Sequence, residues 1–170
     1  ALVTASVHGA FSLIVQQLKA FSDRKGAVPQ PPSLAAILKY LNTAVRSSAN
    51  GTASMTFLAT VTNLKTGEMT FANASHFPPY VLSGKAAAES APEDLIKHLK
   101  AEVVETCPAL GRQETLEAKS GRIQLAPGDA IILYTDGFIE APGALGKKVS
   151  NRKLLKILVD SAVQTGGDPH

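Results

Sequence analysis

The sequence has 170 residues, of which 45% are hydrophobic and 18% charged, and its mean hydropathy is +0.08. These values describe one ordinary globular domain that can bury most of the surface of its unfolded chain, and they exclude a disordered or low-complexity protein. The net charge is only +3, lysine and arginine are scattered, and aromatic residues make up 5%. No nucleic-acid-binding surface is therefore predicted.

The cysteine content and the N-terminal stretch bear on cellular location. Cys107 is the single cysteine, which excludes an intrachain disulfide and a cluster of thiolate metal ligands. The apolar stretch at residues 1–15 lacks a basic leader and is interrupted by polar residues, so it resembles neither a signal peptide nor a membrane span. We expect a cytoplasmic protein, and a membrane tether through another domain of a longer chain stays open.

Apolar residues at helical spacing predict two helices in the N-terminal part of the chain. Steps of four and three residues place one apolar face on the first helix: Val7, Phe11, Ile14, Leu18 and Phe21. Arg24-Lys25-Gly26 should end this helix, and residues 29–32 should form a stiff connector. Ser33 is the expected N-cap of the second helix. The apolar positions of the second helix are Leu34, Ile37, Leu38, Leu41 and Val45.

The apolar spacing then changes to two, which predicts antiparallel strands. Residues 55–62 alternate, residues 63–67 have the composition of a hairpin loop, and Gly67 should adopt the left-handed conformation. The returning strand contains Met69, Phe71 and Asn73, and a short strand is expected over residues 80–82.

The C-terminal half is predicted to contain helices and strands in turn. Pro92 suits the start of a helix, whose apolar side would be Leu95, Ile96 and Leu99. Residues 122–125 alternate as a strand, residues 126–129 suit a type II turn, and residues 130–134 are apolar enough for a central strand. The last helix should pack through Leu154, Leu155, Leu158 and Ala162. This order predicts an α+β fold with helices layered on antiparallel sheets.

Asp136 is the first candidate for a functional side chain. It follows the apolar strand and precedes Gly137, so its carboxylate would be held rigidly and could bind a hard cation such as Mg²⁺ or Mn²⁺. Thr135-Asp136-Gly137 suits an Asx turn equally well, and local chemistry alone leaves both interpretations open with the turn favoured.

His76 is the second candidate, in the segment Asn73-Ala74-Ser75-His76 before a proline corner. It could act as a general acid or as a metal ligand, although a histidine that hydrogen-bonds the backbone of a tight corner is more common. Adjacent residues on an extended chain point to opposite faces, which argues against a Ser75–His76 hydrolytic dyad.

Together the segments FANASHFPPYVL and IQLAPGDAIILYTDGFIEA resemble the metal-dependent PPM class of Ser/Thr protein phosphatases, and within it the bacterial SpoIIE/RsbU-like branch. The opening ALVTASVHGAF resembles the helix that follows the Asp-x-x-Gly-His-Gly segment of this family. The residues that match the two motifs are Asn73, Ala74, His76, Pro78, Leu125, Pro127, Gly128, Asp129, Tyr134, Thr135, Asp136, Gly137, Glu140 and Ala141.

The resemblance implies a four-layer α-β-β-α sandwich of antiparallel sheets flanked by helices, with two Mn²⁺ or Mg²⁺ ions between the sheets. It also implies that the nucleophile is a metal-bound water rather than a catalytic side chain. Of the acids that bind metal in this family, only Asp136 has a counterpart in this sequence, and Gly137 and His76 would adjoin the site. Glu140 is expected to be solvated or to lie behind the ligands.

The sequence departs from the family pattern at three places. Ser75 stands where the family usually has glycine, and the early and late acidic motifs have no counterpart within residues 1–170. We therefore expect one phosphatase domain over residues 1–170, truncated at both ends and inactive as given.

The resemblance implies a phosphoserine/phosphothreonine phosphatase of a bacterial signalling protein. Its substrate would be a phosphorylated anti-sigma-factor antagonist in a partner-switching pathway, and a sensor or receiver domain would precede it in the same chain. A dimer stays open. The alternative is a catalytically inactive pseudophosphatase that serves as a protein-binding module.

Overall fold

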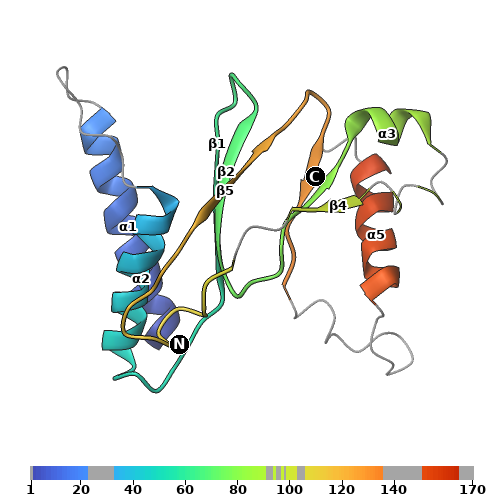
Figure 1. Cartoon of the computed structure of the whole chain (residues 1–170). Coiled ribbons are helices and arrows are strands. Elements are labelled where there is room, and N and C mark those ends of the chain that lie inside the picture. The colour runs from blue at the N-terminus through green and yellow to red at the C-terminus, as the bar shows by residue number, and fades with distance from the viewer. Residues whose placement is uncertain are drawn as a thin grey trace. The chain divides into compact units, whose positions relative to one another are not determined.

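A computed structural model gives the fold of the chain (Figure 1). It describes residues 2–22, 33–90, 94, 97, 99–102, 106–135 and 151–164. The chain divides into two compact units. Unit 1 comprises Ala1–Thr62, Met69–His76 and Val104–Arg122, and unit 2 comprises Asn63–Glu68, Phe77–Val103 and Ile123–His170.

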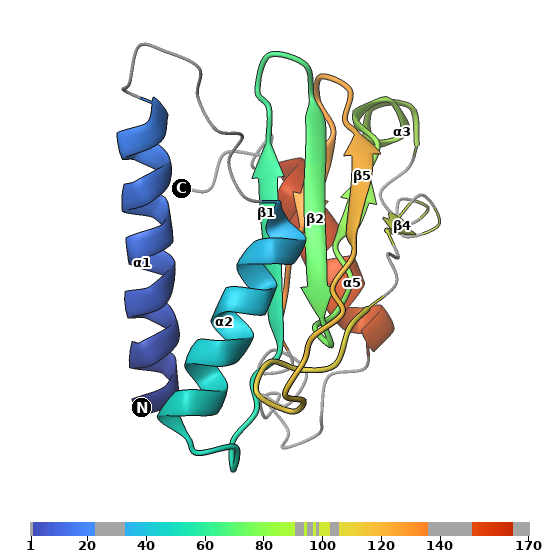
Figure 2. The same ribbon diagram turned by 60° about the vertical axis from the view of Figure 1, so that its left-hand side comes forward.

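Unit 1 begins with the two predicted helices, α1 (Leu2–Ser22) and α2 (Leu34–Ser48), which lie side by side in Figures 1 and 2. Ser33 is the N-cap of α2, since its hydroxyl oxygen accepts a hydrogen bond from the Ala36 N–H at 3.2 Å. The predicted apolar face of α2 is confirmed, because all five of its positions are buried: Leu34, Ile37, Leu38, Leu41 and Val45. On α1, Val7 of the predicted apolar face is buried, whereas Phe11 is exposed beside Phe57, contrary to the prediction.

A three-stranded sheet in the order β1-β2-β5 completes this part of the fold. The strands are β1 (Phe57–Thr62), β2 (Glu68–Ala74) and β5 (Ser120–Gln124). β1 and β2 form the predicted antiparallel hairpin, and Gly67 at its tip has the expected left-handed backbone with φ of 73°. The residues predicted for the return strand, Met69, Phe71 and Asn73, are all buried.

Unit 2 contains a second antiparallel sheet in the order β4-β3-β6. Its strands are β3 (Tyr80–Leu82), β4 (Leu99–Ala101) and β6 (Ala130–Ile132), and the helices are α3 (Gly84–Glu89) and α5 (Asn151–Gln164). Leu82 and Ile132 of the sheet pack with Val159 of α5 in a second apolar core. The predicted α+β class, with antiparallel sheets and flanking helices, is confirmed.

Two sequence predictions in unit 2 are wrong. Leu99 was assigned to a helix but begins β4, because it pairs with Leu82 of β3 and a tertiary contact overrides the helical spacing. The apolar run at residues 130–134 forms a strand only to Ile132, and in the described part of the chain this strand lies at the edge of its sheet rather than at its centre. Leu133 is accordingly 50% exposed.

The remaining sequence predictions fall partly outside the described residues. These are the helix end at Arg24-Lys25-Gly26, the connector at 29–32 and the proposed helix start at Pro92. Within the described residues, no helix combines the length and apolar character needed to cross a membrane.

Candidate functional site

The His76 corner follows directly from the end of β2 and is built by the buried amide of Asn73. The Asn73 Oδ1 atom accepts a hydrogen bond from the His76 N–H at 2.7 Å, and its Nδ2 atom donates to the His76 carbonyl at 2.9 Å. Asn73 is only 2% exposed, so the Asn73 end of each bond is shielded from water. The amide therefore fixes the backbone at His76 from both sides, a role that the sequence analysis did not assign to it.

The backbone conformation of Ser75 explains why the related motif has glycine at this position. Its φ of +54° lies in the left-handed region, which costs a residue with a Cβ atom about 1 kcal/mol or more. The Ser75 hydroxyl donates a hydrogen bond to the Cys107 carbonyl at 3.1 Å, which offsets part of this cost. The serine thus keeps the corner that a glycine would form.

Substitutions of Ser75 should separate backbone strain from the hydrogen bond. We expect Ser75→Gly to stay within about 1 kcal/mol of the wild-type free energy of unfolding, because relief of strain offsets the lost bond. Ser75→Val should lose about 2 kcal/mol, since a β-branched side chain tolerates this backbone poorly. Urea unfolding measures both. Ser120→Val, on an exposed β-strand position, is the control and should cost nothing; an equal loss there would contradict the strain argument.

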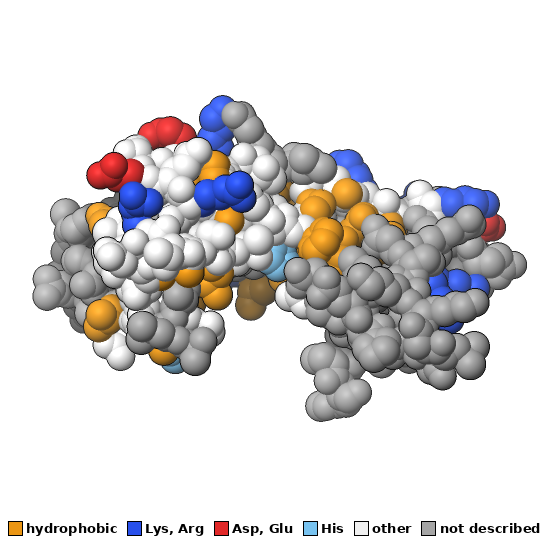
Figure 3. All heavy atoms as spheres, turned by 90° about the horizontal axis from the view of Figure 1, so that it is seen from below, with side chains coloured by type: hydrophobic (Ala, Val, Ile, Leu, Met, Phe, Trp, Pro, Cys, Tyr) orange, Lys and Arg blue, Asp and Glu red, His pale blue; other side chains and the backbone are white. Residues whose placement is uncertain are grey.

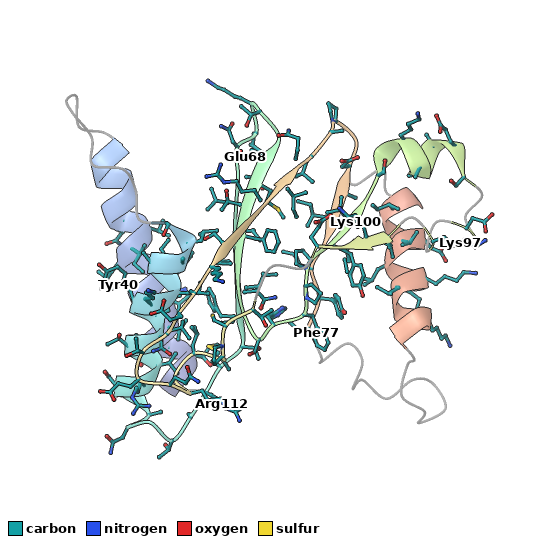
Figure 4. All side chains as sticks on the ribbon, viewed as in Figure 1. Tyr40, Glu68, Phe77, Lys97, Lys100 and Arg112 are labelled. Carbon is teal, nitrogen blue, oxygen red and sulfur yellow. The ribbon has the colours of Figure 1, made fainter. Side chains whose placement is uncertain are left out.

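An aromatic stack joins the two sequence motifs within unit 2. The ring of Phe77 stacks on that of Tyr134 with centroids 5.0 Å apart, and Tyr80 stacks on Tyr134 at 5.9 Å. β3 and β6 pair in the register Tyr80 with Ile132, so Phe77 before β3 and Tyr134 after β6 lie at the same end of the sheet. Phe77 is labelled in Figure 4. The strand end that leads to Thr135 and Asp136 is therefore anchored by Tyr134.

Burial raises the pKa of Tyr134 to about 12, and the neighbouring Tyr80 adds to the increase. In the unfolded chain a tyrosine titrates near pH 10, so the unfolded state loses its proton first as the pH rises. The neutral phenol contributes its full share to the free energy of unfolding below about pH 10. Between about pH 10 and 12 this contribution is lost, and the free energy of unfolding falls by roughly 2 kcal/mol.

This alkaline loss should be smaller in Tyr134→Phe, which keeps the ring but has no titrating hydroxyl. Urea unfolding at several pH values from 8 to 12 (about the range set by these pKa values) would measure the difference. Tyr40→Phe serves as the control, because Tyr40 is exposed on α2. Identical pH profiles for Tyr134→Phe and the wild type would contradict the assignment.

Asp129, the acid of the Pro-Gly-Asp motif, has a structural role. Its Oδ1 atom accepts a hydrogen bond from the Gly84 N–H and its Oδ2 atom one from the Ala126 N–H, both at 2.9 Å. Gly128 takes the left-handed conformation expected for a type II turn, with φ of 88°. A Cβ atom on Gly84 would lie 2.4 Å from the Gly128 carbonyl oxygen, so glycine is required there. Asp129 thus fixes the start of β6 to α3.

The proposed metal ligand Asp136, together with Gly137 and Glu140, lies outside the described residues. Among the residues that the structure describes, no three His, Cys, Asp or Glu side chains form a group that could hold a metal ion. The described acidic residue closest to Asp136 in sequence is Asp129, and both of its carboxylate oxygens accept hydrogen bonds from backbone N–H groups. The described residues by themselves therefore do not form a two-metal centre.

Cys107 is buried, as expected for an inert thiol. Burial raises the pKa of the thiol, and a backbone hydrogen bond opposes this only in part.

On the face drawn in Figure 3, basic side chains lie singly or in small groups rather than in one continuous patch, in line with the low net charge.

Comparison with known proteins identifies the family. The family model described as "Stage II sporulation protein E (SpoIIE)" matches residues 1–168, so the chain belongs to this family. No protein with a curated description matches the sequence. A crystal structure of the RsbU and RsbW domains of Rv1364c from Mycobacterium tuberculosis has a TM-score of 0.60 and 20% sequence identity, and the match covers 95% of this chain. This likeness shows the fold, and with the family match it confirms the predicted SpoIIE/RsbU-like domain of the PPM class.

Two structures from Bacillus subtilis are also similar. The phosphatase domain of the cell fate determinant SpoIIE, presoaked with Mn, has 16% identity and a TM-score of 0.41, with 86% of this chain covered. The PP2C phosphatase domain of SpoIIE with a fragment of its regulatory domain has 16% identity and a TM-score of 0.48, with 94% covered. The chain spans 38% of the Mycobacterium tuberculosis structure and 62% and 46% of these two.

Proposed function

We propose that residues 1–170 form part of one metal-dependent phosphatase domain that removes phosphate from phosphoserine or phosphothreonine in a protein substrate. The observation that carries this proposal is the pairing of β3 with β6 and the stack of Phe77 on Tyr134. These contacts bring two sequence motifs typical of the family to one end of a sheet, although residues 83–122 lie between them in the sequence. If either motif resembled the family only by chance, there would be no reason for the two segments to pair in the folded chain.

In this proposal Asp136 is one ligand of a site for Mn²⁺ or Mg²⁺, and Gly137 and His76 adjoin the site. Such ions would lower the pKa of a bound water and neutralise charge on the phosphoryl oxygens. One carboxylate cannot hold two divalent ions, so the other ligands must be residues outside the two sequence motifs. The described residues fix the backbone conformation of the two motifs.

The proposed substrate is a phosphorylated anti-sigma-factor antagonist, and the proposed setting is a cytoplasmic bacterial signalling pathway. The family match supports a signalling role, and the RsbU and RsbW domains in a similar structure are consistent with partner switching. A sensor or receiver domain in the same protein would control the activity.

The test is phosphate release from a phosphoserine protein by the domain extended at both ends with its native flanking sequence. We expect release that depends on Mn²⁺ or Mg²⁺ and stops on addition of a chelator. No metal-dependent release from the extended domain would contradict the enzymatic proposal.

The second candidate is a pseudophosphatase that binds a phosphorylated or unphosphorylated partner without turnover. In this candidate the protein lacks the acids that would complete a metal site with Asp136. The same extended domain distinguishes the two, because a pseudophosphatase would bind the partner in a pull-down yet release no phosphate.

A further inference from the structure

The buried side chain of Asn42 and the backbone carbonyl of Asn73 bind the two ends of one segment of unit 1, residues 107–114. Within the described part of the chain, Asn42 and Asn73 are the polar residues with almost no exposure, at 1% and 2%. Asn42 lies on α2 and Asn73 at the end of β2. Buried amides are costly unless their groups are paired. The Asn42 amide is paired with backbone groups of the segment, and the Asn73 amide with those of the adjoining His76 corner.

The Asn42 amide binds the C-terminal end of the segment. Its Oδ1 atom accepts a hydrogen bond from the Gly111 N–H at 2.8 Å. Its Nδ2 atom donates to the carbonyls of Gln113 at 3.1 Å and Glu114 at 3.4 Å. Gly111 itself has φ of +83°, and a Cβ atom there would lie 2.5 Å from Cγ1 of Val45, also on α2. The segment thus packs directly on the helix (Figure 4, where Arg112 marks it).

The N-terminal end of the same segment binds the His76 corner. The Cys107 N–H donates to the Asn73 carbonyl at 3.0 Å, and the Ser75 hydroxyl donates to the Cys107 carbonyl at 3.1 Å. Asn73 in turn holds both backbone groups of His76. Cys107 therefore joins the corner from both sides.

The residues between these two ends are buried and tightly bound. Leu110 is fully buried and exchanges two backbone hydrogen bonds with Met55, at 2.8 and 2.9 Å. Ala109 and Cys107 are also buried. A short, closely packed segment of this kind transmits a displacement at one end to the other, because it cannot deform freely.

We propose that Asn42 is a positioning residue for the His76 corner and acts on it through residues 107–114. Helix α2 and the corner would then be energetically coupled, so that loosening either one loosens the other. The coupling itself concerns the fold of unit 1 alone. Its consequence for phosphate release, through a site that His76 adjoins, rests on the proposed function.

Amide hydrogen exchange tests the coupling without reference to enzymatic activity. Asn42→Leu keeps the size of the side chain but removes its hydrogen bonds. We expect the exchange rates of the His76 and Cys107 amides to rise about tenfold, as for the loss of one buried hydrogen bond. The amides of the paired residues Ala59 and Ala72 in β1 and β2 should change less than about twofold. Thr43→Leu is the matched control, since Thr43 is the next residue on α2 and is exposed.

The reverse measurement covers the case in which Asn42→Leu does not fold. Coupling is reciprocal, so Ser75→Ala at the exposed corner should speed exchange of the Gly111 amide. A uniform rise over all amides of unit 1 would mean that Asn42 has a general structural role and would overturn the proposal. So would unchanged exchange at the far end in both variants. Loss of phosphatase activity with unchanged exchange would leave the proposed function standing and reject the coupling.

Discussion

Asp136→Asn should abolish metal-dependent phosphate release by the extended domain, with a loss of more than about 100-fold. Changes behind a metal ligand already cost about 10–100-fold, and a ligand should cost more. Asparagine has the same shape but no charge, so it weakens the attraction for a divalent ion while the fold is kept. Phosphate release and Mn²⁺ binding by calorimetry are the two measurements.

Asp160→Asn provides a matched control for this prediction. Asp160 lies on α5, and the same loss of charge there should leave turnover and Mn²⁺ binding within about twofold, as for most changes away from a site. Normal turnover in Asp136→Asn would show that this residue is not a ligand. Lost turnover with normal Mn²⁺ binding would assign it another role.

Asn73→Ala should lower the free energy of unfolding by about 3 kcal/mol, the largest stability effect that we expect from a single side chain. It removes two hydrogen bonds to the His76 backbone and leaves a buried cavity. Urea unfolding followed by circular dichroism measures this loss. The variant should also weaken phosphate release, because the corner that His76 occupies would no longer be fixed.

Asn63→Ala is the control, because Asn63 has a similar bonding pattern in an exposed place. Its Oδ1 atom accepts hydrogen bonds from the Lys65 and Thr66 N–H groups at 3.0 and 3.3 Å in the hairpin loop. Water can replace these bonds, so we expect a loss of no more than about 1 kcal/mol. Equal losses for the two variants would contradict the importance of burial at Asn73.

The elements that follow from local sequence were predicted with little error. The apolar positions of α2, its Ser33 cap and the left-handed glycine in the β1–β2 hairpin are each fixed by a few neighbouring residues. The type II turn before β6 has the same local origin, since Gly128 supplies the backbone that the turn requires.

Predictions that depended on distant partners were less accurate. Leu99 has the spacing of a helix but pairs with Leu82, and nothing near it in the sequence indicates that partner. The predicted Leu158 does pack against the second core, but the fully buried residue of α5 is its neighbour Val159, which was not predicted. Asn42 could have been noticed, because it lies four residues after Leu38 and three before Val45, on the apolar face of α2.

The class of the fold, the two motifs and the family resemblance follow from the sequence alone, because hydrophobic spacing and turn chemistry are local. The roles of the individual motif residues became clear from their contacts in the folded chain. Asp129 accepts hydrogen bonds from backbone N–H groups, and Ser75 adopts a left-handed backbone conformation. Asn73 accepts a hydrogen bond from the His76 N–H and so supports the corner. The physical reason is that a polar side chain takes its role from the groups it meets, and those groups come from parts of the chain that are distant in sequence.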